Sequence, residues 1–249
     1  MEIDFAQLAL IWAAVIFAAV LRAFTGFGFA LAAVPVFSLF LPPSQAVVLG
    51  SALILAISLL NIRSFMGVVP LRPVAPLLFM AVLGTGVGVL LLTLISANSF
   101  QLWAGMLVIL VCAVMTFYKP SASTQNPFAV KVAAAIAGLL AGLMNGVLAM
   151  PGPPIIIFTL MTKPDPQHSR AQLMTLLMAA AVIALISYAL AGFITEQSLL
   201  NFLLAFPAML LGDKLGSFLF ARFGQALYRK VAIVALLAVG VATLFSALS

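Results

Sequence analysis

Long apolar runs alternate with short polar segments along the whole chain, and this pattern predicts ten helical segments in two groups of five. In the first group the predicted segments are 8–23, 27–41, 46–62, 74–95 and 102–118. In the second group they are 131–143, 155–161, 173–191, 199–220 and 231–248. A helix needs about 20 apolar residues to cross a bilayer. The second segment of each group is shorter, so these two are either spans or re-entrant hairpins, and eight to ten segments are expected.

Glycine and proline interrupt the apolar pattern at two corresponding places. The first interruption is the stretch TGFGFALAAVP at 25–35, and the second is NGVLAMPGPP at 145–154. Their flanks are too hydrophobic for a turn exposed to water. Broken backbone within a bilayer persists only where it is buried in protein or lines a cavity. Two breaks at matching places in two halves point to a substrate site near the midplane; the alternative is that these glycines only let helices pack closely.

Composition places the chain among integral membrane proteins. Hydrophobic residues make up 65% of the chain, charged residues 6%, and the mean hydropathy is +1.32. A soluble domain carries about 25% charged residues. We therefore predict an all-α integral membrane protein. The N-terminus lacks the basic region of a cleaved signal peptide, and the single cysteine, Cys112, excludes a disulfide within the chain.

The two groups of segments also look like two copies of one unit. A polar, proline-containing linker at 119–130 separates a first repeat at 1–118 from a second at 131–249. The fourth segment of each repeat carries a G-x-x-x-G spacing, Gly84 to Gly88 in the first and Gly212 to Gly216 in the second. This spacing allows close approach of helices, and its matching position supports an internal repeat.

Basic residues indicate which polar segments face the cytoplasm. The basic residues of the loops are Arg63, Arg72, Lys119, Lys131, Lys163, Arg170, Arg222, Arg229 and Lys230. The other turns, at 42–45, 96–101 and 195–198, contain no Lys or Arg. By the positive-inside rule the basic loops are cytoplasmic and both termini lie outside. The net charge of +6 is explained in this way and does not indicate nucleic-acid binding.

An odd number of segments per repeat inverts the second repeat relative to the first. The loop after the third segment is basic in the first repeat, at 63–72, whereas its counterpart carries Glu196 and no basic residue. The charges thus predict two inverted repeats, the arrangement found in many secondary transporters.

The two motifs resemble those of a known family. Gly26-Phe27-Gly28 followed by Pro35, and the later cluster of Gly146 with Pro151, Gly152 and Pro153, are similar to the signatures of the sulfite exporter TauE/SafE family. The resemblance covers nearly the whole chain. It departs in having less glycine than is usual in both signatures. The resemblance implies a permease of the bacterial inner membrane for small sulfur-containing anions such as sulfite or organosulfonates.

Neutral donors near the breaks are the candidate binding groups. A broken helix presents unpaired N–H groups and a positive dipole end, which bind anions without a fixed charge. The breaks at Gly28 and Pro153 could each present such an end, with Thr25, Asn145, Ser51 and Thr175 adding side-chain donors. The predicted substrate-binding residues are Thr25, Gly26, Phe27, Gly28, Ser51, Asn145, Gly146, Pro151, Gly152, Pro153 and Thr175.

Four ionisable residues are candidates for an electrostatic or coupling role. Asp213 and Lys214 lie within a predicted span, where charges are functional candidates by default. Alternatively, Lys214 reaches the membrane interface and Asp213 pairs with a nearby base. Arg22 either guides anions at the cytoplasmic mouth or anchors the topology. His168, expected in a cytoplasmic loop, either relays protons or is simply solvated.

These features favour a carrier over other classes of protein. The predicted spans hold no His/Asp/Glu cluster for an enzyme or a metal site, and no Walker A motif encodes direct use of ATP. We therefore expect no cofactor. The expected partners are a small anionic substrate, the bilayer and a coupling ion, H⁺ or Na⁺; a homodimer is left open. The alternatives are a permease for another organic anion such as a carboxylate, and a membrane assembly subunit that transports nothing.

Overall fold

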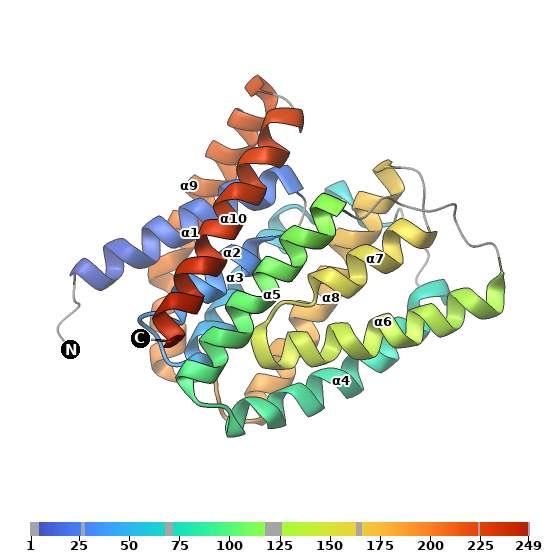
Figure 1. The fold of residues 1–249 in the computed structure, drawn as a ribbon, viewed down its shortest axis with the longest axis horizontal. Helices are drawn as coiled ribbons and strands as arrows, with labels where there is room; N and C mark the ends of the chain where they lie inside the picture. Colours follow the sequence, from blue (N-terminus) through green and yellow to red (C-terminus); the bar gives the residue numbers. More distant parts are fainter. Residues whose placement is uncertain are drawn as a thin grey trace. The chain divides into compact units, whose positions relative to one another are not determined.

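The computed structural model describes residues 5–25, 28–67, 72–117, 126–162, 166–223 and 225–248. Within these ranges the chain is helical and contains no strand (Figure 1). The first five α-helices are α1 (Phe5–Thr25), α2 (Phe29–Phe37), α3 (Pro43–Leu60), α4 (Ala75–Leu94) and α5 (Ala97–Phe117). The second five are α6 (Pro127–Leu148), α7 (Gly152–Thr162), α8 (Pro166–Leu190), α9 (Glu196–Phe223) and α10 (Gln225–Leu248). Two short 3₁₀ helices, η1 (Ile62–Ser64) and η2 (Arg72–Val74), lie between α3 and α4.

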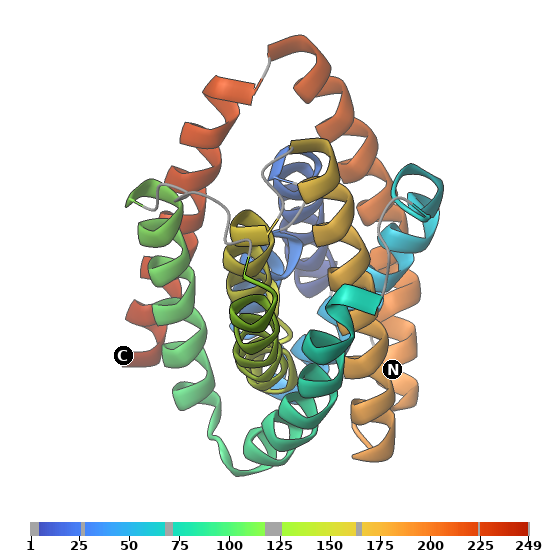
Figure 2. The same cartoon turned by 90° about the vertical axis from the view of Figure 1, so that its right-hand side faces the viewer.

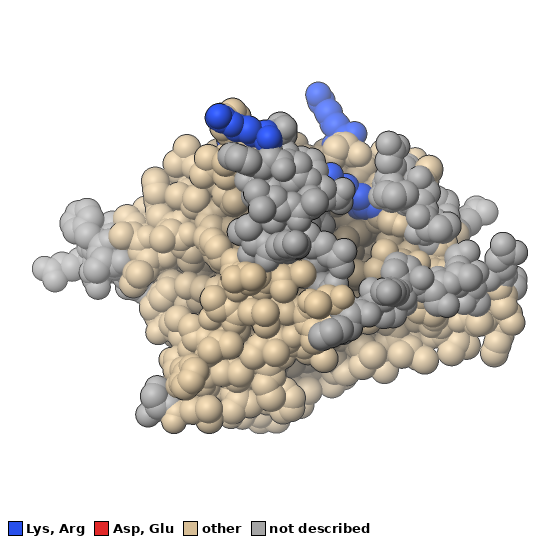
Figure 3. Space-filling view, turned by 45° about the horizontal axis from the view of Figure 1, so that its top comes forward, with Lys and Arg blue, Asp and Glu red and all other residues tan. Residues whose placement is uncertain are grey.

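Five of the described helices contain a segment long and apolar enough to cross a bilayer. These segments are Pro43–Leu60, Ala75–Leu94, Phe128–Leu148, His168–Leu190 and Glu196–Leu219. The described surface on the face drawn in Figure 3 is almost entirely free of charged side chains, with a few Lys or Arg and no Asp or Glu. The predicted all-α integral membrane class is confirmed.

Several helices extend into segments that were predicted as loops. The turn expected at 96–101 is mostly the start of α5, because the Ser96 hydroxyl accepts a hydrogen bond from the Ser99 N–H and so caps the helix. The loop expected at 163–170 gives way to α8 from Pro166, which places His168 in a helix. The basic loop expected at 222–230 is helical on both sides of residue 224. Polarity alone does not separate a loop from the first turn of a helix.

The helices fall into two compact units. Unit 1 contains α1, α2, the first part of α3, α5, α9 and α10; unit 2 contains the last part of α3 with α4, α6, α7 and α8. Each unit draws helices from both predicted repeats. Most of the linker predicted at 119–130 lies outside the described residues, and the division into repeats at 1–118 and 131–249 stays a prediction.

Unit 2 is built on a contact between α4 and α6, which lie side by side in Figures 1 and 2. Five glycines line this contact, namely Gly84, Gly88, Gly138, Gly142 and Gly146. A methyl group at Gly142 would lie 2.8 Å from the backbone nitrogen of Thr85, and one at Gly88 would lie 2.9 Å from Cα of Gly146. The two backbones therefore touch directly, as small residues permit between membrane helices.

In unit 1, α1 packs against α9, and α5 packs against α10. Gly212 of α9 lies against α1, where an added methyl group would meet the Ile16 carbonyl oxygen at 2.8 Å and the Ala19 methyl at 2.7 Å. The indole N–H of Trp12 in α1 donates to the Leu204 carbonyl oxygen of α9 at 2.9 Å. The first helix of this unit is thus fixed to α9 both by close packing and by a hydrogen bond.

Candidate functional site

The first predicted break lies between α1 and α2. Gly28 precedes α2 with φ of +100°, a left-handed conformation that glycine adopts without steric cost. The short helix that follows is buried at all positions but one and packs against α1, α5 and α10. At its far end, the Gln101 side chain of α5 donates to the Ser38 carbonyl oxygen at 2.6 Å. Gly26, Phe27 and the side chain of Thr25 lie outside the described residues.

The second predicted break lies between α6 and α7 and is shorter than expected. Only residues 149–151 are non-helical. Ala149 closes α6 with φ of +55°, and its N–H donates to the Asn145 carbonyl oxygen at 2.8 Å. Asn145 and Gly146 were predicted to belong to the break, and this is wrong: both lie in the last turns of α6. Gly146 does not end α6; instead it lets the backbone of α6 pack closely against α4.

The starts of α2 and α7 differ chemically. The first four N–H groups of a helix have no hydrogen-bond partner within the helix. At the start of α2, every residue has a backbone N–H. In α7 the first four residues are Gly152, Pro153, Pro154 and Ile155, of which only the first and last carry an N–H. Both starts are buried. The start of α2 is therefore the better supplied with backbone donors.

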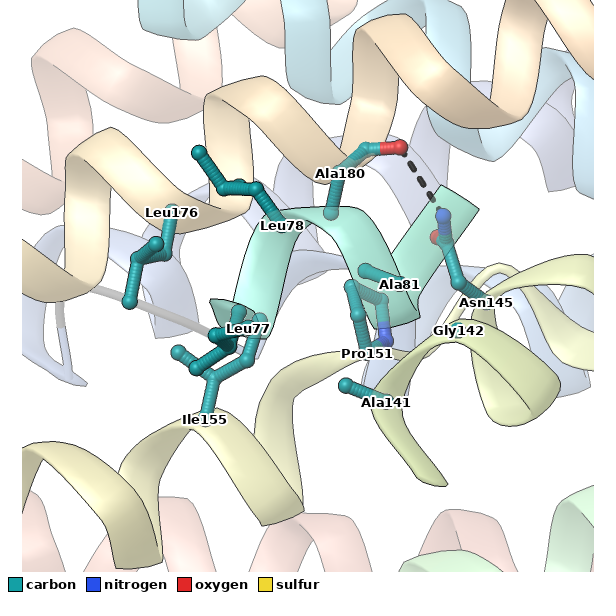
Figure 4. A pocket seen from close by; sticks show the side chains of 10 residues that line it. All are labelled: Leu77, Leu78, Ala81, Ala141, Gly142, Asn145, Pro151, Ile155, Leu176 and Ala180. Carbon is teal, nitrogen blue, oxygen red and sulfur yellow. Dashed lines mark hydrogen bonds between the residues drawn. The ribbon is translucent and has the colours of Figure 1, made fainter. Parts of the chain in front are cut away.

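A polar junction sits beside the second break. Asn145 is 2% exposed, and its amide nitrogen donates to the Ala180 carbonyl oxygen of α8 at 2.8 Å (Figure 4). The same nitrogen donates to the Thr85 hydroxyl of α4 at 3.4 Å. The Tyr188 hydroxyl of α8 donates to the carbonyl oxygens of Asn145, at 2.7 Å, and Gly146, at 3.2 Å. The Asn145 amide donors are thus used to join α4, α6 and α8 in this conformation.

A narrow apolar crevice runs beside this junction (Figure 4). Its lining residues are Leu77, Leu78, Ala81, Ala141, Gly142, Asn145, Pro151, Ile155, Leu176 and Ala180. The space between them does not admit a water molecule. Of the predicted binding residues, Asn145 and Pro151 line the crevice. An anion could enter here only after the surrounding helices separate.

The remaining neutral candidates are dispersed. Ser51 is buried in the part of α3 that belongs to unit 1. The Thr175 hydroxyl of α8 donates to the Ala171 carbonyl oxygen of its own helix at 2.8 Å. Thr159 of α7, which sequence reasoning missed, is buried, and its hydroxyl has no hydrogen-bond partner among the described residues. An unused buried hydroxyl costs free energy, which makes Thr159 a better candidate donor than Thr175.

The ionisable candidates separate into an ion pair and two exposed residues. Arg22 of α1 lies 3.6 Å from the Asp213 carboxylate of α9, and the Arg22 side chain is buried. The alternative in which Asp213 pairs with a nearby base is confirmed, and that base is Arg22. Lys214 and His168 are exposed. Among the residues that the structure describes, no group of three His, Cys, Asp or Glu side chains could hold a metal ion.

Comparison with known proteins identifies the family. No curated protein and no solved structure matches the chain. The family model described as Sulfite exporter TauE/SafE matches residues 11–243, nearly the whole chain, and includes both helix breaks. The chain belongs to the Sulfite exporter TauE/SafE family of membrane transporters.

Proposed function

We propose that this chain is a secondary permease that moves small sulfur-containing anions, such as sulfite, sulfoacetate or other organosulfonates, across the bacterial inner membrane. Membership of the Sulfite exporter TauE/SafE family supports the substrate class. One structural observation carries the proposal. In each predicted repeat, the first helix stops at a break and a short helix with a buried start follows it.

A buried helix start is an anion site that needs no fixed charge, because backbone N–H groups and the helix dipole both favour negative charge. In secondary transporters such starts lie at the midplane and face the substrate. We propose that each of the two breaks does so here and offers its helix start to the substrate anion. The proposed binding residues are those predicted above, to which the structure adds Thr159.

The closed crevice in unit 2 is consistent with a carrier in a conformation that has no substrate bound. Alternating access requires that a site be shut on at least one side at any time. The lining of this crevice is neutral, so it would bind an anion weakly enough to release it. We propose further that the basic loops face the cytoplasm, that both termini lie outside, and that H⁺ or Na⁺ drives transport.

Uptake into proteoliposomes tests the function directly. Purified protein would be given sulfite, sulfoacetate and a small carboxylate under an imposed H⁺ or Na⁺ gradient. We expect the two sulfur anions to be transported. Transport of the carboxylate alone would favour a permease for other organic anions, and the absence of any transport would favour an assembly subunit.

Substitution at the second break links the function to the site. An added methyl group at Gly152 would meet only Ile156 Cδ1, at 3.9 Å, so Gly152→Ala should fold normally. It narrows the helix start, and we expect kcat/KM for sulfite to fall by about tenfold, which corresponds to about 1.4 kcal/mol. Gly86→Ala is the matched control, because a methyl group there meets nothing within 4 Å. Equal loss of transport in both variants would show that the second break is not part of the substrate site.

A further inference from the structure

Two helix pairs take equivalent places in the two predicted repeats. In unit 2, the first helix of the second repeat, α6, packs against the fourth helix of the first, α4. In unit 1, the first helix of the first repeat, α1, packs against the fourth helix of the second, α9. The first glycine of each G-x-x-x-G spacing faces the partner helix, with Gly84 against α6 and Gly212 against α1. The two contacts can therefore be compared residue by residue.

The residue after that glycine differs between the two contacts. In α4 it is Thr85, which is fully buried and accepts a hydrogen bond from Asn145 of α6. In α9 it is Asp213, which pairs with Arg22 of α1. A neutral pair in unit 2 is thus replaced by an ion pair in unit 1. Close packing of the helices does not require the charges, because unit 2 achieves it without them.

The ion pair lies where charges are costly. Asp213 is six residues before the end of the candidate span Glu196–Leu219, or about 9 Å along the helix. Arg22 lies three residues before the end of α1 and the first break. The separation of 3.6 Å exceeds the 2.7–2.9 Å of a close charge-assisted hydrogen bond. The Arg22 side chain is 8% exposed, whereas the Asp213 side chain is 26% exposed. The Asp213 carboxylate thus contacts a buried guanidinium at more than this distance and itself remains accessible.

We propose that Arg22 is the anion-binding charge of unit 1 and that Asp213 occupies it until the substrate anion takes its place. This inference rests on the proposed permease function. The guanidinium presents parallel N–H donors that fit two oxygens of a sulfite, sulfonate or carboxylate group. Exchange of one anion for another at Arg22 leaves the buried positive charge compensated throughout. The competing explanation is that the pair only fastens α1 to α9.

Two single variants separate these explanations through the KM for uptake into proteoliposomes. Arg22→Gln removes the binding charge, and we expect the KM to rise by about 10- to 100-fold. Asp213→Asn removes the competing carboxylate, so the KM should fall while kcat falls as well, because release becomes slower. A pair that is merely structural would shift the KM of both variants in the same direction.

The double variant Arg22→Gln with Asp213→Asn gives a second test. The double variant leaves no charge at either position of the pair. If the pair is only structural, the KM should therefore return toward the wild-type value relative to the single variants. The exchange model predicts no recovery, with the KM as high as in Arg22→Gln. Lys131→Gln is the matched control, because it removes one positive charge from an exposed position on the equivalent first helix, α6. Its KM should equal that of the wild type.

If Arg22→Gln does not fold, Arg22→Lys keeps the charge but loses the planar donors, and an intermediate KM is expected. The substrate panel keeps the two proposals apart. If only the carboxylate is transported, and Arg22→Gln and Asp213→Asn shift its KM in opposite directions, the exchange at Arg22 is supported and the proposal of a sulfur-containing substrate is refuted. Parallel shifts with sulfite as substrate would overturn the exchange and leave the permease intact. A wild-type protein that neither transports nor is thermally stabilised by any anion of the panel would overturn both.

Discussion

A methyl group at Gly142 of α6 tests the contact on which unit 2 is built. In Gly142→Ala the new Cβ would lie 2.8 Å from the Thr85 backbone nitrogen and 2.9 Å from Ala81 Cα, and it would also meet the Ala81 carbonyl oxygen. Ordinary contacts of this kind begin at 3.4 Å. All three atoms belong to the backbone of α4, so no side chain can turn away. The two helices must move apart along their whole glycine-lined contact.

The cost can be isolated by comparison with Gly86→Ala. Overpacking of this kind costs about 1–3 kcal/mol, while alanine in place of glycine gains up to about 1 kcal/mol of helix propensity. The gain is common to both variants, because both positions lie within helices. At Gly86 there is nothing within 4 Å to contact. The difference between the two variants should therefore be the packing cost alone, about 1–3 kcal/mol.

Thermal unfolding in detergent measures this difference. The fraction of protein that remains monodisperse after heating gives a midpoint for each variant under identical conditions. One kcal/mol corresponds to about 2–4 °C for a chain of this size, so Gly142→Ala should melt several degrees below Gly86→Ala. Equal midpoints would show that α4 and α6 are not in backbone contact and would refute the structural basis of unit 2.

Four further outcomes are expected. Ala149→Gly should raise the free energy of unfolding by about 1 kcal/mol, because its φ of +55° suits glycine; an unchanged midpoint would argue against this conformation. Tyr188→Phe should lower the free energy of unfolding by about 1–3 kcal/mol, since it removes the hydroxyl that donates to the Gly146 carbonyl oxygen and one of the two donors of the Asn145 carbonyl oxygen; a neutral effect would contradict these hydrogen bonds. Thr159→Val should not lower stability, because the hydroxyl has no hydrogen-bond partner in the part of the chain that the structure describes, but it should raise the KM for sulfite if the hydroxyl binds substrate; a large loss of stability would contradict an unused hydroxyl. Single cysteines can be placed at the exposed positions Ser64 and Glu196 in a background without Cys112. In an inverted repeat these positions lie on opposite sides of the membrane, so an impermeant thiol reagent added to one side should label only one of them. Equal labelling from one side would refute the inverted repeat.

The helix breaks could be predicted because their cause is local. Gly28 adopts a left-handed conformation, and the sequence from Pro151 to Pro154 denies a helix several of its N–H donors. Both effects depend on residue type alone. The apolar runs likewise predict helices within a membrane, since the bilayer offers no other partner for backbone hydrogen bonds.

Helix ends and hydrogen-bond partners could not be predicted in the same way. Ser96 looks like part of a turn but caps α5. Gly146 looks like part of a break but packs against α4. The roles of Thr85 and Tyr188 depend on which helices meet, and no local pattern specifies that. The spacing Gly138-x-x-x-Gly142-x-x-x-Gly146 was the available signal that α6 would meet another glycine-lined helix.

Two costs that the structure carries in unit 2 lie on the C-terminal side of α6, at the second break and in α7. Ala149 holds a left-handed conformation that is unfavourable for alanine by about 1–2 kcal/mol. Thr159 buries a hydroxyl that no described residue hydrogen-bonds, which costs about 1–3 kcal/mol. Beside them, five glycines forgo side-chain packing so that α4 and α6 can touch. Strain and unmet hydrogen bonds persist where function requires them. Within unit 2 we therefore expect the second break and α7 to meet substrate, beside Asn145 and Gly146 in the last turns of α6.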